Sequence, residues 1–130
     1  MMKRILLIFT VFLSCSKTDC KDLVFKDGIT TLKGDLYSGD CSEYYSNGQI
    51  KSIQKYLDGK DHGEWVFYYP AEIIRTRGEF NKGVRVGKWE YFYNNGNPWK
   101  IHYYDSIGKR TGKWITYSLD KTIDSIHSYK

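Results

Sequence analysis

The sequence predicts an all-β protein, an elongated and twisted antiparallel β-meander built from tandem β-hairpins of about 24 residues. The first observation is composition: the 130 residues are 17% aromatic and include 12 Gly but only 2 Pro. This balance suits short strands and tight turns and is unlike that of a disordered chain. The second is a Gly-x-Trp segment that recurs at a nearly constant interval. The third is the strand-like alternation and turn signal that follow each recurrence. The length suits one domain.

The N-terminus has the features of an export signal. Lys3 and Arg4 precede an apolar run at 5–13, which is too short to cross a bilayer as a helix. The segment Phe12-Leu13-Ser14-Cys15 resembles a bacterial lipobox. We therefore expect residues 1–14 to be a lipoprotein signal peptide, Cys15 to be lipidated, and residues 15–22 to comprise this cysteine and a tether. The alternatives are ordinary secretion with an unmodified Cys15, or a buried N-terminal strand.

This signal predicts a lipid-anchored protein of the bacterial cell envelope, attached through two or more acyl chains. Ser16 follows the cysteine where an aspartate would indicate inner-membrane retention, so the outer membrane is the expected location. The net charge is +5, and removal of Lys3 and Arg4 with the signal lowers it to +3. The remaining basic residues are scattered, so we expect no nucleic-acid partner.

Residues 23–38 are expected to form an N-terminal capping hairpin, because repeat arrays need an atypical end. Four repeats should follow over 39–130, with bounds 39–62, 63–86, 87–111 and 112–130. Three of them begin with Gly-x-Trp, and the first begins with Gly39-Asp40-Cys41. The glycine and tryptophan of these segments are the expected repeat core: Gly63, Trp65, Gly87, Trp89, Gly112 and Trp114.

Each repeat reads as one hairpin. Aromatic residues follow five and six positions after the first glycine, and another aromatic follows at seventeen. Asn47-Gly48 and Asn95-Gly96 lie between the two strands and indicate type I′ turns. A polar Gly-x-x-x-Gly segment then turns the chain into the next repeat. Alternation places Trp65, Phe67 and Tyr69 on one face, so that face should stack one tryptophan from each repeat.

The chain resembles the MORN-repeat family, and more closely its bacterial variant repeat. The resemblance lies in Tyr-Tyr-x-Asn-Gly at 44–48, Phe-Tyr-Asn-Asn-Gly at 92–96 and the three Gly-x-x-x-Gly-x-Trp segments. It departs at Cys41 in a tryptophan position, at 70–72 in a turn and at 118–121 in the last turn. The resemblance implies a tandem hairpin sheet. It also implies a role as an antitoxin or immunity protein, since many bacterial variants are described in that way.

With Cys15 assigned to lipid, Cys20 and Cys41 remain. An oxidising envelope would allow a disulfide between them. The alternative is that Cys41 is a small buried substitute for tryptophan. The sequence leaves both open.

The sequence predicts neither catalysis nor a bound metal or cofactor. His102 and His127 occupy equivalent positions in successive repeats, about 10 Å apart and too far to share zinc. We therefore interpret the histidines as solvated surface residues. The carboxylates are dispersed and should form cross-strand ion pairs, and an open meander lacks a deep catalytic cleft. We expect a protein that is not an enzyme.

Recognition through the sheet surface is the remaining function. Tyrosine and tryptophan dominate binding hot spots, and Trp99, which follows Pro98, is the candidate exposed anchor. Its alternative is packing against Ile101 or Tyr103. We expect a protein partner, and the family resemblance implies that this partner is a toxin. The competing hypotheses are a glycan or cell-wall binder, a structural envelope scaffold assembled through sheet edges, and recognition of membrane lipid.

Overall fold

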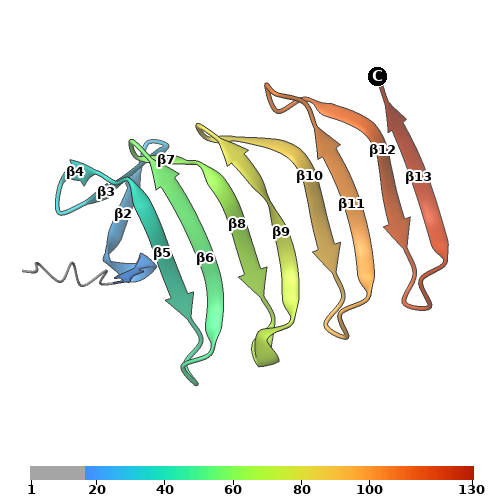
Figure 1. The fold of residues 1–130 in the computed structure, drawn as a ribbon, viewed down its shortest axis with the longest axis horizontal. Coiled ribbons are helices and arrows are strands. Elements are labelled where there is room, and N and C mark those ends of the chain that lie inside the picture. Colours follow the sequence, from blue (N-terminus) through green and yellow to red (C-terminus); the bar gives the residue numbers. More distant parts are fainter. Residues whose placement is uncertain (1–16) are drawn as a thin grey trace, which may run out of the picture.

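The computed structural model describes residues 17–130, which form one long antiparallel sheet and one small sheet (Figure 1). The expected lipidation site Cys15 lies outside the described residues. Eight strands of the long sheet follow one another in chain order: β5 (Gly39–Tyr44), β6 (Ile50–Leu57), β8 (Gly63–Tyr68), β9 (Ile74–Asn81), β10 (Val84–Phe92), β11 (Pro98–Tyr104), β12 (Arg110–Tyr117) and β13 (Ile123–Tyr129). The predicted all-β meander is confirmed. Within the described residues no helix is long and apolar enough to cross a membrane.

Two short strands join this sheet at its N-terminal end. β7 (Lys60–Asp61) pairs with the end of β6, and β1 (Thr18–Asp19) pairs in parallel with β5. A 3₁₀ turn, η1 (Cys20–Asp22), follows β1. Residues 18–22, expected to be a plain tether, are therefore built into the fold.

The small sheet, which we call the cap, contains β2 (Leu23–Lys26), β3 (Ile29–Leu32) and β4 (Asp35–Leu36). The sequence indicated a hairpin here, and the structure adds a third short strand. Cys20 and Cys41 are joined by a disulfide, with their Cα atoms 5.0 Å apart. A bond that closes a loop of this length stabilises the fold by about 3 kcal/mol, mainly by restricting the unfolded chain.

The prediction of type I′ turns at the Asn-Gly pairs was wrong. At 45–49 only Gly48 has a positive φ, and its amide donates to the carbonyl of Tyr45. This is a three-residue loop that ends in a left-handed glycine. Positive φ at both central residues occurs instead on the opposite edge, at Asp58-Gly59 and Lys82-Gly83. The predicted turn type is therefore on the other edge, where the Gly-x-x-x-Gly segments lie.

The 25-residue spacing of the third repeat comes from this second edge. Tyr56 pairs with Asp61 across a two-residue turn, whereas Tyr104 pairs with Arg110 across a turn that is one residue longer. The second repeat also differs from the first and third on the other edge of the sheet. There η2 (Pro70–Glu72) replaces the Asn-Gly loop, with positive φ at Ala71 and Glu72.

Among residues 17–130 nothing but the cap forms a second layer on the long sheet, so the burial seen there comes mostly from the sheet's own side chains. The fully buried side chains are few: Trp89 at 1% exposure, with Cys41, Ser42 and Ser52. Most of the aromatic rings are half-buried against neighbours on the same face. A single layer of this kind leaves a large aromatic surface in contact with solvent.

Candidate binding face

We call the side of the long sheet that carries Trp65, Trp89 and Trp114 the Trp face. Ring contacts run along it from repeat to repeat. Trp65 lies 5.3 Å from Tyr56 and 4.9 Å from Phe80, and Phe80 lies 5.0 Å from Trp89. Most of these pairs are edge-to-face, the arrangement that aromatic quadrupoles favour. The predicted stacking of one tryptophan per repeat is thus a ladder in which other aromatic rings alternate with the tryptophans.

Hydrogen bonds repeat with the same period and join each repeat to the next. The indole Nε1 atoms of Trp65, Trp89 and Trp114 donate to the carbonyls of Lys55, Glu79 and Tyr103. The hydroxyls of Tyr45, Tyr69 and Tyr93 donate to the carbonyls of Tyr68, Phe92 and Tyr117. In the fourth repeat the position of these tyrosines holds Ser118. The conserved geometry of each interface therefore explains why the same residue types recur.

Within its own hairpin each tryptophan lies opposite a small or polar residue. Trp65 pairs with Gly78, Trp89 with His102 and Trp114 with His127. Trp89 packs directly on Gly78, where an added Cβ would come within 2.6 Å of three indole atoms. Trp114 stacks on His102 with ring centroids 3.8 Å apart and an interplanar angle of 11°.

The interpretation of the histidines as solvated surface residues was wrong for His102. Its ring is half-buried between Trp114 and Tyr91. Burial lowers the pKa of His102 to about 4, and the cations Lys100, Arg110 and Arg85 act in the same direction. His62 accepts a hydrogen bond from the Lys82 amide at Nδ1, and only His127 is exposed.

Arginines cover two of the three tryptophans. The Arg85 guanidinium carbon lies 4.5 Å from the Trp89 ring centroid, and that of Arg110 lies 4.9 Å from the Trp114 ring. Both are cation–π contacts within one strand, with the arginine four residues before the tryptophan. The corresponding residue before Trp65 is Asp61.

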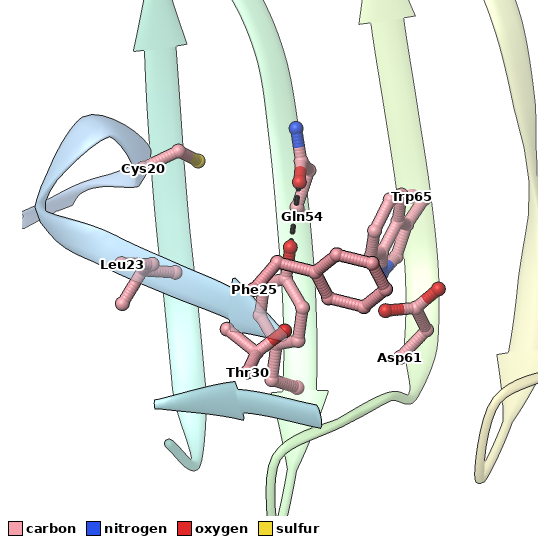
Figure 2. A pocket seen from close by; sticks show the side chains of 8 residues that line it. Cys20, Leu23, Phe25, Thr30, Gln54, Asp61 and Trp65 are labelled. Atoms are coloured by element: carbon pink, nitrogen blue, oxygen red, sulfur yellow. Dashed lines mark hydrogen bonds between the residues drawn. The ribbon is translucent and has the colours of Figure 1, made fainter. Parts of the chain in front are cut away.

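A pocket of about 300 Å³ lies where the cap meets the Trp face (Figure 2). Its walls are mostly apolar. Figure 2 shows the ring of Phe25 and the indole of Trp65 close to the Asp61 carboxylate. The lining residues are Cys20, Leu23, Phe25, Thr30, Gln54, Tyr56, Asp61 and Trp65.

Asp61 is the one ionisable carboxylate of this lining. Burial raises the pKa of the Asp61 carboxyl. Burial, the charge of Asp61 and the neighbouring Tyr37 raise the pKa of Tyr56 to about 12. The Tyr56 hydroxyl donates to Gln54 Oε1 at 2.7 Å. Among residues 17–130 no lysine, arginine or histidine forms an ion pair with Asp61.

The opposite face carries an expected cross-strand ion pair, in which Glu90 of β10 lies 2.7 Å from Arg77 Nε of β9. Glu90 also lies 2.8 Å from Lys88 Nζ on its own strand. Burial alone would raise the pKa of Glu90, but its hydrogen bonds with Lys88 and Arg77 lower the pKa overall. These exposed pairs contribute little to stability individually.

Trp99 and the repeat glycines, which the sequence predicted as site residues, do not line the pocket. Trp99 is 36% exposed, 5.8 Å from the ring of Tyr93, with Lys100 Nζ 4.1 Å from its own ring centroid. It lies two repeats away from the pocket. Gly63, Gly87 and Gly112 all have positive φ; Gly63 is the first residue of β8, whereas Gly87 and Gly112 lie inside β10 and β12. No cluster that could hold a metal ion occurs among residues 17–130.

Sequence reasoning missed the pocket because three of its residues come from the cap, which does not follow the repeat. One signal was present: Asp61 replaces arginine two positions before a Gly-x-Trp.

The repeat assignment is supported by comparison with known proteins. Residues 37–58 and 85–106 match the MORN repeat variant model. These segments contain most of the first repeat and most of the third. No curated protein matches the chain. A solved structure, "Crystal structure of GtfA/B complex bound to UDP and GlcNAc", aligns with 82% of this chain at 11% identity and a TM-score of 0.35. The aligned region spans 23% of that protein chain.

Proposed function

We propose that this protein is a non-enzymatic, lipid-anchored component of the bacterial envelope that binds a protein partner on its Trp face. The observation that carries this proposal is how the face is covered. The cap packs on the Trp face of the first repeat, where its residues Leu23 and Phe25 line a pocket together with Tyr56 and Trp65. The Trp face of the later repeats has no such cover within the described residues. A surface that already accepts a polypeptide at one end is suited to accept another beside it.

The chemistry of the open part fits a protein better than a sugar. A sugar needs a free aromatic face for stacking, but Trp89 is buried and Arg85 and Arg110 lie over two of the indoles. Exposed arginines beside half-buried rings are typical of protein interfaces, which are enriched in aromatic residues and arginine. Trp99 is a further exposed aromatic ring, 5.8 Å from the ring of Tyr93.

The role we propose for the complex is that of an antitoxin or immunity protein that covers a toxin's surface. The support for this finer role is the resemblance to bacterial variant-repeat proteins. Anchoring through Cys15, with location at the outer membrane, is supported by the export signal alone.

The partner hypothesis is tested in cells. Deletion of this gene should slow growth only in a strain that also expresses the secreted protein encoded beside it, and the purified full-length protein should form a complex with that protein. Restoration by wild type but not by an Arg85→Glu/Arg110→Glu variant would place the contact on the Trp face. An Arg77→Glu variant on the opposite face is the matched control. Equal growth of all strains, with no complex, would contradict the proposal.

The anchor has a separate test. A Cys15→Ser variant should lose palmitate label and leave the membrane fraction. If the variant keeps the palmitate label and stays in the membrane fraction, the proposed anchor is wrong, while the partner hypothesis is unaffected.

A further inference from the structure

Position by position, the interface between the first and second repeats differs from the two that follow it. Two positions before the first glycine of the third repeat, and again of the fourth, stands an arginine whose guanidinium lies over the tryptophan of its own strand. Two positions before the first glycine of the second repeat stands Asp61. The chain therefore supplies its own cation at Trp89 and Trp114, and supplies a carboxylate at Trp65.

The surroundings of Trp65 also differ from those of Trp89 and Trp114. The cap adds Phe25 and Leu23 above the sheet, so the space beside Trp65 becomes a pocket of about 300 Å³ (Figure 2). Three aromatic side chains, Phe25, Tyr56 and Trp65, line it together with the carboxylate. A volume of this size holds a small organic group or the end of a long side chain.

Aromatic faces attract cations through the negative potential of the ring, and the attraction is stronger where the cation is desolvated. A carboxylate beside the rings adds a charged acceptor for an N–H group. The Gln54 amide nitrogen donates to Ser52 Oγ, and the Tyr56 hydroxyl donates to Gln54. The side chains of Gln54 and Tyr56 are thus already paired within the chain, and Asp61 is the charged group of the lining that can meet a ligand.

We propose that this pocket binds an organic cation, and that in the complex described above the cation is the ammonium or guanidinium end of a lysine or arginine side chain of the partner. The partner's side chain would take the place over Trp65 that Arg85 and Arg110 take over the other two tryptophans. Phe25, which is 72% exposed at the mouth of the pocket, would lose solvent exposure when the cation enters. This inference rests on the proposed function for the source of the cation, but the pocket's preference for cations does not depend on it.

The experiment follows the Trp65 indole N–H by NMR in the intact protein. The probes are acetyl-lysine methylamide, acetyl-arginine methylamide, choline, and 3,3-dimethylbutanol, which is a neutral isostere of choline. The cations should shift the Trp65 resonance saturably, and they should bind at least about tenfold more tightly than the neutral isostere. Equal binding of choline and its isostere, or no saturable shift with any cation, would overturn the proposal.

Two variants make the test specific. Asp61→Asn keeps the shape of the pocket and should weaken cation binding about tenfold, because it removes the charged acceptor. Asp61→Arg recreates the pattern of the later repeats and should abolish binding, because the chain would then place its own guanidinium over Trp65. Glu64→Gln, an equal charge change on the exposed opposite face, is the matched control and should bind as wild type does. Unchanged affinity in Asp61→Asn would also overturn the proposal.

The same titration separates the sources of the cation. Binding of the lysine or arginine probe supports a protein side chain. Binding of choline alone, with a matching response to phosphatidylcholine vesicles, would overturn the assignment to a protein side chain. If the amino-acid probes bind but no protein complex forms in cells, the proposed function fails while the cation site stands. If a complex forms but no cation binds, only the present inference fails.

Discussion

The backbone of Gly78 lies directly beneath the indole of Trp89, which is the most completely buried aromatic side chain of the described chain. Gly78 has an ordinary strand conformation, so its small size, and not backbone freedom, explains the glycine. The other interfaces hold larger side chains in the same position of the repeat, such as Gln54 and His102. The packing of each tryptophan is thus adjusted locally by one residue of the preceding repeat.

A Gly78→Ala substitution should therefore destabilise the fold by about 2 kcal/mol, the usual cost of overpacking a filled site. The added Cβ cannot be accommodated unless the Trp89 ring moves. Urea denaturation followed by tryptophan fluorescence measures the loss. Thr76→Ala on the same strand is the control and should cost less than about 1 kcal/mol. Equal stability of Gly78→Ala and wild type would show that the indole can shift freely.

His102 makes stability depend on pH. Its pKa is lowered to about 4 in the folded state, with burial as the main cause, and is about 6.5 in the unfolded chain. Between these values the unfolded state binds more protons, so the free energy of unfolding should fall as the pH falls from 6.5 towards 4. Well above pH 6.5 the imidazole is largely neutral in both states, and the effect disappears.

The measurement is urea denaturation of wild type and His102→Gln at pH 7.5 and pH 5.2. Glutamine is the natural occupant of the equivalent position at 54, so it should fit. We expect the stability lost between the two pH values to be smaller in His102→Gln than in wild type. His127→Gln, an exposed position, should lose as much as wild type. The same loss in both variants would mean that the His102 imidazole is solvated.

At the scale of elements, one turn between strands, at Gly59, also contacts the cap. Gly59 and Gly83 occupy the same turn in successive repeats, with φ of 76° and 93°. A Cβ on Gly83 would meet nothing within 4 Å, but one on Gly59 would lie 2.8 Å from the Thr30 carbonyl and close to Ile29 and Leu36. The Thr30 amide also donates to the Gly59 carbonyl at 2.7 Å.

Gly83→Ala should therefore cost about 1 kcal/mol, for the strained backbone alone. Gly59→Ala should cost more, because the cap must also move away from the turn. Hydrogen exchange at the Thr30 amide separates the two effects: it should accelerate in Gly59→Ala and remain slow in Gly83→Ala. Similar exchange in both variants would indicate that the cap does not depend on this contact.

At the scale of the whole molecule, the repeat period predicted the fold because each interface uses the same bonds. The Trp65, Trp89 and Trp114 indoles make equivalent hydrogen bonds, so the signal appears three times in the sequence. Features that occur once were not predictable in this way. The cap strands depart from the period, and the burial of His102 depends on a tryptophan from another strand. The Asn-Gly turns were assigned the wrong type because dipeptide preference does not fix loop length.

The two ends of the long sheet are also unequal. At the N-terminal end, β1, the cap and the Cys20–Cys41 disulfide cover the first repeat. At the other end β13 is an edge strand, with Ile123 and Ile126 about half exposed. In a tandem array each repeat is stabilised mainly by its neighbours, so a terminal repeat with one neighbour opens most easily.

Native-state hydrogen exchange should therefore be fastest in β12 and β13, and slower in the strands from β5 to β10. Reduction of the disulfide should remove about 3 kcal/mol from the protection of the N-terminal end, since the loop is no longer closed in the unfolded chain. It should leave the exchange of β13 unchanged, because three repeat interfaces separate the two ends. If reduction accelerated exchange equally in β5 and β13, the sheet would unfold as one cooperative unit and the array description would be wrong.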